Sequence, residues 1–186
     1  MRLKTERLIL RDYCDEDKAD LVANINDEDV TKYLRKVPFP YTEADAEWYL
    51  NKCKVDIAKT PRQEHSFVIE LKETGEFMGS VGLHEIDDFG KEATVGYWLG
   101  KKGWRNGYMY EAAKEVLRFA FEDIGLRRID IEADVDNEPS NGLIKKLGFQ
   151  YEGMRCQYRK TKSTGKTPDA NQYGMLKEDW EELKNK

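Results

Sequence analysis

The sequence predicts one α/β domain with a mixed sheet, and three observations support this fold class. Alternating apolar residues typical of strands recur along the chain, and stretches with helical periodicity stand between them. No internal repeat and no linker long enough to separate domains interrupts the 186 residues. The expected order is a strand, three helices, three strands, a helix, a strand, a helix and two strands. We therefore expect a single domain over residues 1–186.

The first part of the chain predicts a strand followed by three helices. Residues 5–11 alternate around two leucines, as in a half-buried strand. Asp15, Asp27 and Thr42 are candidate N-caps, and Thr42 is followed three residues later by an acid, as in a capping box. Residues 55–64 are expected to form a polar loop. The third helix is expected to turn Trp48, Tyr49, Leu50 and Cys53 inward.

The rest of the chain predicts strands that alternate with two helices. After Gly107, apolar residues recur at intervals near four until Gly125, which predicts a long helix with one buried face. Asn137 starts a shorter helix that ends at Gly148. The expected strands are 66–71, 77–86, 93–99, 129–135, 149–158 and 172–177, and a helical turn is expected at 178–183.

The glycine-containing basic loop at 100–107 is the most informative segment. It joins an expected strand to the long helix, so several backbone N–H groups at the helix start lack partners. The positive end of the helix dipole lies behind them, which predicts a site for a phosphate-bearing ligand. The segment lacks the Gly-Lys-Ser/Thr ending of a Walker loop and the G-x-G-x-x-G spacing of a Rossmann loop. An ordinary loop before a core helix is the alternative interpretation.

Composition narrows the class of protein. Charged residues make up 36% and apolar residues 39% of the chain, and the net charge of −5 argues against general nucleic-acid binding. No apolar run approaches the length of a membrane span, and the chain opens on a strand pattern rather than a signal peptide, so we expect a cytoplasmic protein without membrane association. Three widely spaced cysteines and two histidines provide neither a disulfide framework nor a metal motif.

The basic loop resembles the coenzyme A pyrophosphate loop of the GNAT superfamily of N-acetyltransferases, with the pattern Gln/Arg-x-x-Gly-x-Gly/Ala. Only Gly107 matches that pattern strictly, since Trp104 holds its first position and Met109 its last. The loop is more similar to the subgroup of ribosomal-protein serine/alanine N-terminal acetyltransferases, although Arg105 replaces a glycine. Other segments similar to the family follow in its order: 5–11, 26–34, 79–83, 96–99, 137–140, 146–149 and 175–180.

The resemblance implies a GNAT fold, with a mixed and mostly antiparallel sheet flanked by helices, and acetyl-CoA as cosubstrate without a metal. Pantetheine would lie where the fourth and fifth expected strands splay apart, paired with the backbone of Trp98 and Leu99. The diphosphate would lie on the N–H groups of residues 105–109, and Lys101, Lys102 or Arg105 can add charge, although surface solvation is the ordinary role of such lysines. The cofactor-binding residues are thus Trp98, Leu99, Trp104, Arg105, Asn106, Gly107, Tyr108, Met109, Asn137 and Ser140.

Asn137 and Ser140 have two interpretations. In the family this region contacts the reactive arm of the cofactor, so Asn137 can bind pantetheine and Ser140 can donate to the departing thiolate. Asn and Ser are also ordinary residues of a helix N-cap. Many relatives use as an acid a tyrosine seven residues after this asparagine. Here Ile144 stands at that position, so Ser140 or water must serve.

The general base is open, because Thr94 stands where some relatives carry a glutamate. His84, Glu85 and Glu92 are the nearby candidates, and each can equally be a surface or packing residue. An α-amino group, with a reference pKa near 7.7–8.0, is freed at pH 7 for about 1 kcal/mol, whereas lysine needs about 4–5 kcal/mol. The absence of a strong base therefore favours a protein N-terminus or a similar low-pKa amine as acceptor.

Three functions remain open at this level. The first is an N-acetyltransferase that transfers the acetyl group to a primary amine by direct attack. The second is a non-catalytic module that binds acyl-CoA as a sensor, and the third is a nucleotide-binding protein that uses the same loop. The acceptor pocket is expected from the first two helices and from loops 55–64 and 159–171. A homodimer is compatible with the family.

Overall fold

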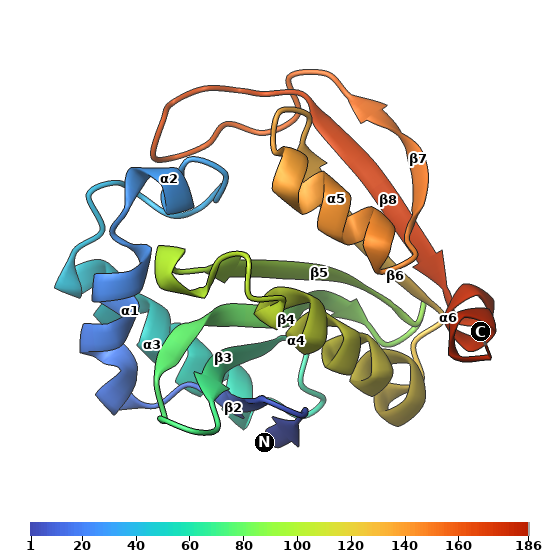
Figure 1. Ribbon diagram of the computed structural model, residues 1–186, viewed down its shortest axis with the longest axis horizontal. Helices are drawn as coiled ribbons and strands as arrows, with labels where there is room; N and C mark the ends of the chain where they lie inside the picture. Colours follow the sequence, from blue (N-terminus) through green and yellow to red (C-terminus); the bar gives the residue numbers. More distant parts are fainter. Residues whose placement is uncertain (186) are drawn as a thin grey trace.

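The structure is a computed structural model that describes residues 1–185. Within those residues, eight strands form one sheet in the order β1-β2-β3-β4-β5-β6-β8-β7 (Figure 1). All neighbouring strands are antiparallel except β5 and β6, which are parallel. The strands are β1 (Arg2–Lys4), β2 (Leu8–Asp12), β3 (His65–Leu71), β4 (Phe77–Asp87), β5 (Glu92–Leu99), β6 (Arg128–Asp134), β7 (Gln150–Arg155) and β8 (Ala170–Leu176).

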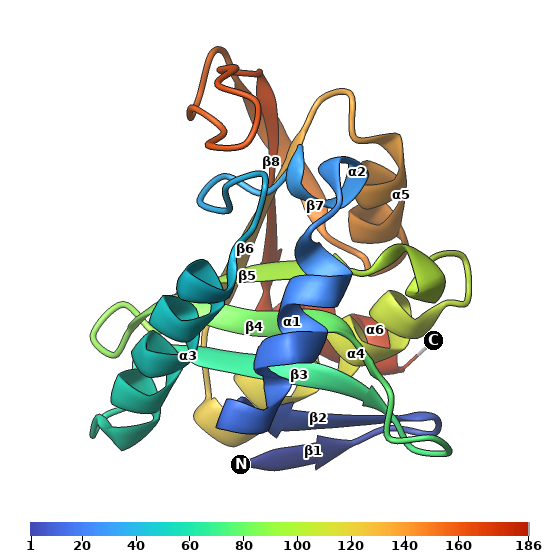
Figure 2. The ribbon, with the colours of Figure 1, turned by 90° about the vertical axis from the view of Figure 1, so that its left-hand side faces the viewer.

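Helices cover both faces of the sheet and enclose two apolar clusters. Figure 2 shows α1 and α3 in front of the middle strands and α4 behind them. Val68 and Phe77 belong to the cluster under α1 and α3, whereas Phe67 and Val81 belong to the cluster under α4. The helices are α1 (Lys18–Ile25), α2 (Glu28–Thr31), α3 (Glu43–Ala58), α4 (Tyr108–Arg118), α5 (Glu138–Lys146) and α6 (Lys177–Lys184). None of the helices in the described part of the chain is long and apolar enough to cross a membrane.

The expected element order and helix caps are largely confirmed. Asp27 accepts a hydrogen bond from the first turn of α2, and Thr42 forms a capping box with Asp45 at the start of α3. Asn137 caps α5, and Gly125 adopts the left-handed conformation that ends the long helical segment. The mixed, mostly antiparallel sheet agrees with the GNAT fold that the resemblance implied.

Five details of the prediction were wrong. Asp15 is not an N-cap, because it lies inside a 3₁₀ turn whose N-cap is Cys14, and α1 begins only at Lys18. The expected first strand is a hairpin, because residues 2–4 form β1 against β2. Trp48 is 68% exposed rather than inward. Helix α3 continues to Ala58, so the polar loop before β3 is shorter than expected. The long helix ends in a π-helical segment over Phe119–Ile124, which its apolar repeat did not predict.

Candidate active site

The second half of β5 has no strand beside it on the β6 side. The two strands pair only at Glu92, Ala93 and Thr94, and beyond Thr94 they diverge (Figure 1). The connection between them contains α4, as expected for a parallel pair. The predicted splay between the fourth and fifth expected strands is therefore present, between β5 and β6.

Alternate residues of β5 direct their backbone groups into this gap. The N–H of Gly100 donates to β4, whereas the carbonyl of Lys91 accepts from the segment that enters β6. Because backbone groups of successive residues point to opposite edges of a strand, the odd-numbered residues of β5 face the gap. The expected pantetheine contacts change accordingly. The backbone of Leu99 and of Tyr97 faces the gap, whereas that of Trp98 faces β4. Pantetheine contact at Leu99 and Tyr97 stays a prediction.

The start of α4 carries a row of unpaired amides. Gly107 is the N-cap and adopts a left-handed conformation with φ of 77°. The first amide to donate back is that of Glu111, to the Gly107 carbonyl at 3.1 Å. Within residues 1–185, the N–H groups of residues 105–109 have no protein acceptor. Amides at the positive end of a helix attract phosphate. Diphosphate binding by Arg105, Asn106, Gly107, Tyr108 and Met109 stays a prediction.

Arg7 anchors this loop to the N-terminal hairpin. Its guanidinium donates to the Asn106 carbonyl at 3.0 Å and to Glu111 at 2.7 Å, and it lies 4.8 Å from the centre of the Tyr108 ring. Thr5 donates to the same carboxylate at 2.5 Å. Burial raises the pKa of Glu111, but hydrogen bonds from Thr5 and Arg7 outweigh it and hold that pKa below the usual value. The sequence prediction missed this anchor, which joins residues about a hundred positions apart.

The side chains of the loop have separate roles. The indole N–H of Trp104 donates to the Leu99 carbonyl at 2.9 Å and thereby ties the loop to β5. Lys101 and Lys102 form ion pairs with carboxylates of α2 and of the β3–β4 turn at 2.7 and 2.6 Å. Their charge is therefore shared with the protein rather than free for a ligand. Arg105 has a φ of 62° and forms no ion pair within the described chain.

Ser140 and Tyr97 meet across the gap. Their hydroxyl oxygens are 3.0 Å apart, which joins the first turn of α5 to β5. Burial raises the pKa of Tyr97 to about 12, although the hydrogen bond with Ser140 acts in the opposite direction. Asn137 accepts from the Ser140 N–H at 3.3 Å, so its capping role is confirmed and its contact with pantetheine stays a prediction. Tyr97 is a site residue that the sequence prediction missed.

His84 lies on the face of the sheet that α3 covers, opposite the face that α4 covers. Its Nδ1 is 3.5 Å from Glu64 Oε2, and Lys52 of α3 also contacts that carboxylate. Hydrogen bonding with His84 lowers the pKa of Glu64 to about 2, with Lys52 acting in the same direction. The other edge of the imidazole lies over Gly96, since an added Cβ there would be 3.5 Å from Nε2. His84 is thus beside the open part of β5.

Glu92 is far from the open part of β5. It begins β5 at the end that still pairs with β6, and it forms an ion pair with Arg127 at 3.2 Å. Gly96 is four residue steps further along the strand, or about 13 Å at the usual rise per residue. Of the three catalytic candidates, the structure brings Ser140 and His84 to the gap and leaves Glu92 outside it. Glu92 is therefore too far from the open part of β5 to act as the general base there.

The face of β6 that points away from α4 carries acidic residues, and these are paired with an arginine of the protein. Arg35 contacts Asp134 and lies 3.8 Å from Glu132. It also donates to Thr161 at 3.0 Å, so it joins the segment after α2 to the loop between β7 and β8. The side chain of Ser163 donates to the Thr31 carbonyl at 3.0 Å and reinforces this connection. The loop at 159–171 is therefore fastened to the α2 region and, through Arg35, to β6. Its part in an acceptor pocket stays a prediction.

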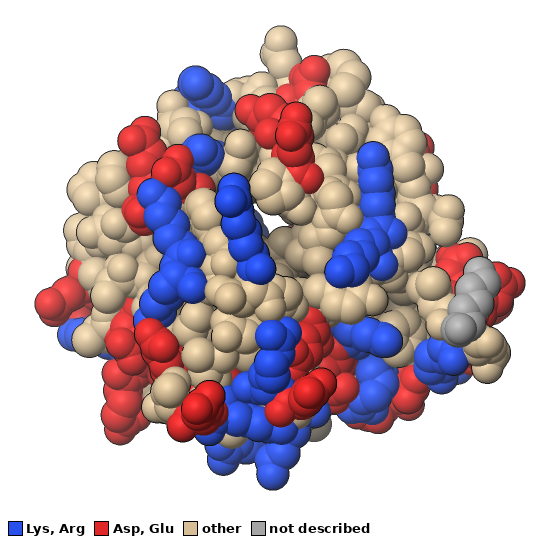
Figure 3. Space-filling view, viewed as in Figure 1, with Lys and Arg blue, Asp and Glu red and all other residues tan. Residues whose placement is uncertain are grey.

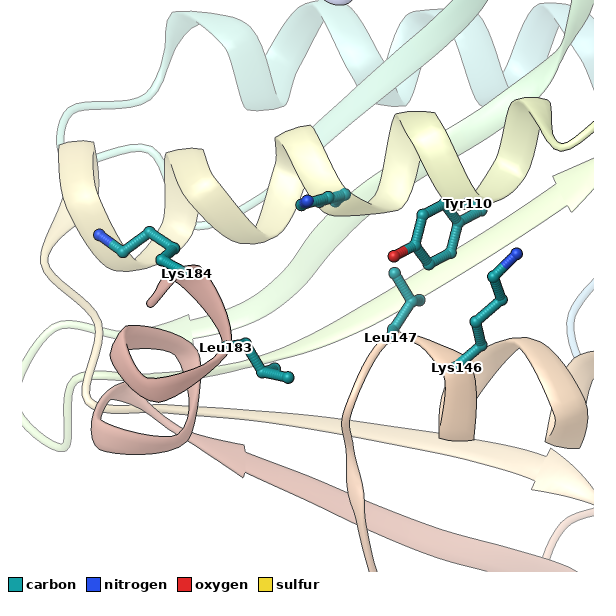
Figure 4. Close-up of a pocket in the computed structure, with 6 residues that line it drawn as sticks. Tyr110, Lys146, Leu147, Leu183 and Lys184 are labelled. Atoms are coloured by element: carbon teal, nitrogen blue, oxygen red, sulfur yellow. The ribbon is translucent and has the colours of Figure 1, made fainter. Parts of the chain in front are cut away.

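The surface on the α4–α5 side is hollowed in two places. Figure 3 shows an opening between the end of β5, the tip of the α2 region and the start of α5, with Lys and Arg side chains on both sides. Figure 4 shows a separate pocket where α4, α5 and α6 meet. Lys146 Nζ lies 4.5 Å from the centre of the Tyr110 ring there. The pocket is lined by Tyr110, Lys114, Lys146, Leu147, Leu183 and Lys184.

Comparison with known proteins identifies the family. The model of the acetyltransferase (GNAT) domain matches residues 7–150. The chain is 33% identical over 180 residues to the uncharacterized N-acetyltransferase p20 of Bacillus licheniformis, which covers 96% of this chain and 97% of that protein. The chain therefore belongs to the GNAT acetyltransferase family, whose members are acetyl-CoA-dependent acyltransferases.

Two further similarities agree with this assignment. The chain is 31% identical over 82 residues to the ribosomal-protein-serine acetyltransferase of Escherichia coli, a match that covers 44% of this chain and 46% of that protein. A GNAT-family acetyltransferase from Bacillus anthracis has a crystal structure that superposes with a TM-score of 0.81 at 25% identity. That superposition covers 96% of this chain and 99% of the other.

Proposed function

We propose that this acetyltransferase moves the acetyl group of acetyl-CoA to a primary amine by direct attack in the gap between β5 and β6. The observation that carries the proposal is the edge of β5 that has no neighbouring strand, next to the unpaired amides of residues 105–109. These two features suit the amide-bearing arm and the diphosphate of one ligand. The backbone of Tyr97 and Leu99 would pair with the arm, and the pocket at Tyr110 and Lys146 would receive the adenosine end.

The proposed transfer takes two bond changes. The amine nitrogen attacks the thioester carbon, a C–N bond forms, and the carbonyl π electrons move onto oxygen. A gap-facing N–H of β5 donates to this oxyanion, and one such donor typically contributes about 10²–10³ in rate. The C=O bond then re-forms and the C–S bond breaks. The hydroxyl of Ser140 donates to the departing sulfur while Tyr97 donates to Ser140.

Direct attack is preferred to an acyl-enzyme because the cysteines are poorly suited to be nucleophiles. Burial raises the pKa of Cys14 and of Cys53 to about 11, so both are thiols at neutral pH. Cys156 is exposed near the end of β7, beyond the strand that borders the gap. An amine that reaches the thioester itself needs no such intermediate.

The proposed acceptor is an α-amino group, at a protein or peptide N-terminus or on a small molecule of similar pKa. A polyamine would require several free carboxylates, whereas Asp134 and Glu132 are engaged by Arg35. An α-amine is also cheaper to deprotonate than lysine at pH 7, by about 3–4 kcal/mol. The name of the Escherichia coli relative, which refers to ribosomal-protein serine, is compatible with this class.

Thiol release from acetyl-CoA over a panel of amines tests the proposal. The panel holds peptides with free Ser or Ala N-termini, the same peptides with a blocked N-terminus and one lysine, spermidine, a free amino acid and an aminoglycoside. We expect the highest kcat/KM for a free α-amine and no turnover for the blocked peptides. Calorimetry with coenzyme A, ATP and NAD serves as the binding control. Tight coenzyme A binding with no turnover on any amine would instead favour a sensor module.

A further inference from the structure

We infer that Glu64 is a positioning residue that orients His84 as the proton acceptor for the incoming amine. This inference rests on the proposed function, since it concerns the same gap. His84 belongs to β4 and Glu64 to the segment that enters β3, and the two side chains meet under α3. The Nδ1 edge of the imidazole faces the carboxylate, 3.5 Å from Oε2.

The contact with Glu64 selects one form of the neutral imidazole. A neutral histidine carries its proton on one nitrogen, and the nitrogen beside a carboxylate is the one that keeps it. The proton therefore stays on Nδ1, and Nε2 keeps a free lone pair. Hydrogen bonds between catalytic groups are commonly longer in the free enzyme than in the complex with substrate. The 3.5 Å between His84 Nδ1 and Glu64 Oε2 agrees with a hydrogen bond that shortens on binding.

The free nitrogen points to the open part of the sheet. Nε2 would be 3.5 Å from a Cβ placed on Gly96, and Gly82 pairs with Gly96 on the neighbouring strand. Because these two paired residues are glycines, the surface of the sheet beside the imidazole carries no side chains there. Gly96 stands next to Tyr97, whose backbone N–H faces the gap. An amine that enters from the α1–α3 face can therefore reach both the thioester and Nε2, directly or through one water.

Lys52 keeps the carboxylate in place and ionised. It contacts Glu64 and also binds Asp56 at 2.8 Å, so the carboxylate is fixed from α3 as well as from β4. The remaining neighbours of His84 on β5, Thr94 and Gly96, are uncharged. Arg62 donates to the Glu64 carbonyl, but its guanidinium is paired with Asp12.

The proton balance is complete with these groups. Attack leaves a positively charged nitrogen on the tetrahedral intermediate, and one N–H proton moves to Nε2 of His84. The imidazolium that results is stabilised by the Glu64 carboxylate. Collapse then gives the neutral amide and the coenzyme A thiolate, and His84 returns its proton to solvent before the next turnover.

Steady-state kinetics with the best amine of the panel test the inference. We expect H84Q to lower kcat about 10²-fold or more, as loss of a general base does, with the KM for acetyl-CoA within about twofold. E64Q should lower kcat by about tenfold, because the imidazole is then no longer held with its proton on Nδ1. D88N, which removes an exposed carboxylate from the turn after β4, should change neither. Imidazole in the buffer should partly restore H84A.

Two results would overturn the inference while leaving the proposed function intact: an active H84Q, or an E64Q that keeps the native rate. A readout that needs no turnover is the tautomer of His84, from nitrogen chemical shifts. The chain has only two histidines, so H84Q assigns the resonance. We expect Nδ1–H in the native protein and a mixture of tautomers in E64Q. If the native protein already shows Nε2–H, the orientation proposed for His84 is wrong even if acetyl transfer is observed.

Discussion

Tyr97 is a residue with two roles in the proposed site, through different atoms. Its backbone faces the gap, and its side chain crosses to Ser140 on α5 with the oxygens 3.0 Å apart. The pair spans 43 positions of sequence, which explains why spacing along the chain did not reveal it. The position seven residues after Asn137, where many relatives carry a tyrosine that acts as an acid, holds the fully buried Ile144. The hydroxyl that partners Ser140 comes from a strand instead.

We predict that Y97F and S140A both lower kcat without comparable loss of acetyl-CoA affinity. Y97F removes one hydrogen bond to Ser140, with an expected cost of about 1–1.5 kcal/mol or about 5–10-fold in rate. S140A removes the proposed hydrogen-bond donor to the departing sulfur and should cost more. The measurement is kcat at saturating acetyl-CoA. Y151F, at an exposed position of β7, is the control and should keep the native rate.

Arg7 is the residue on which the shape of the diphosphate loop depends. We predict that R7A weakens coenzyme A binding about 5–30-fold, since two charge-assisted hydrogen bonds that fix Asn106 and Glu111 are lost. Calorimetric titration measures the Kd. R2A removes an exposed arginine of the same hairpin, 3.8 Å from Glu70, and should bind normally. Equal affinity of R7A and the native protein would mean that the loop holds its shape unaided.

At the scale of helices and strands, the sequence predicted the features that depend on contacts between residues close together in the chain. The caps at Asp27, Thr42 and Asn137 each act within three residues, and all three are in place. The hairpin β1–β2 was missed because Arg2, Leu3 and Lys4 are too few to show alternation. The outward turn of Trp48 depends on which side of α3 meets the sheet, which apolar character alone does not decide.

The capping box of α3 gives a prediction of its own. Thr42 Oγ1 accepts from the Asp45 N–H at 3.2 Å, while Asp45 accepts from the Thr42 N–H at 3.0 Å. T42A should therefore lower the free energy of unfolding by about 1 kcal/mol, within a usual range of about 0.5–2. Urea unfolding followed by circular dichroism measures this. T42S keeps the hydroxyl and should lose only a small part, so equal losses in both variants would exclude the cap as the cause.

At the scale of the whole molecule, the gap between β5 and β6 is the feature that joins fold and function. The sheet is continuous only because three residue pairs link the two strands, and the strands separate where the cofactor is expected. The order of segments resembling a known family predicted this architecture. The contacts that cross the gap or fasten its rim were not predicted, since Arg35 meets Asp134 across 99 positions and Thr161 across 126. Such contacts exist only once the chain is folded.

The N-terminal half also concentrates carboxylates that folding keeps ionised, which predicts acid sensitivity. Burial raises the pKa of Asp17, but hydrogen bonds from Arg11 and from the Cys14 N–H outweigh it, so the folded pKa lies below the usual value. A depressed folded pKa stabilises the protein above the unfolded pKa near 4, and that contribution disappears as pH falls below it. Asp12 and Glu64 of the same half follow this rule, and so does Glu111 of α4. The Tm should therefore fall steeply below about pH 4.5.

D17N isolates one of these contributions. At pH 7 it removes charged hydrogen bonds worth about 1.5–3 kcal/mol, which is a loss of about 3–12 °C in Tm for a domain of this size. The difference from the native protein should shrink as pH falls toward about 3, because the native carboxylate is then protonated as well. D20N changes an exposed carboxylate of α1 and should follow the native curve throughout. A difference between D17N and the native protein that stays constant with pH would show that Asp17 stabilises the fold by packing rather than by charge.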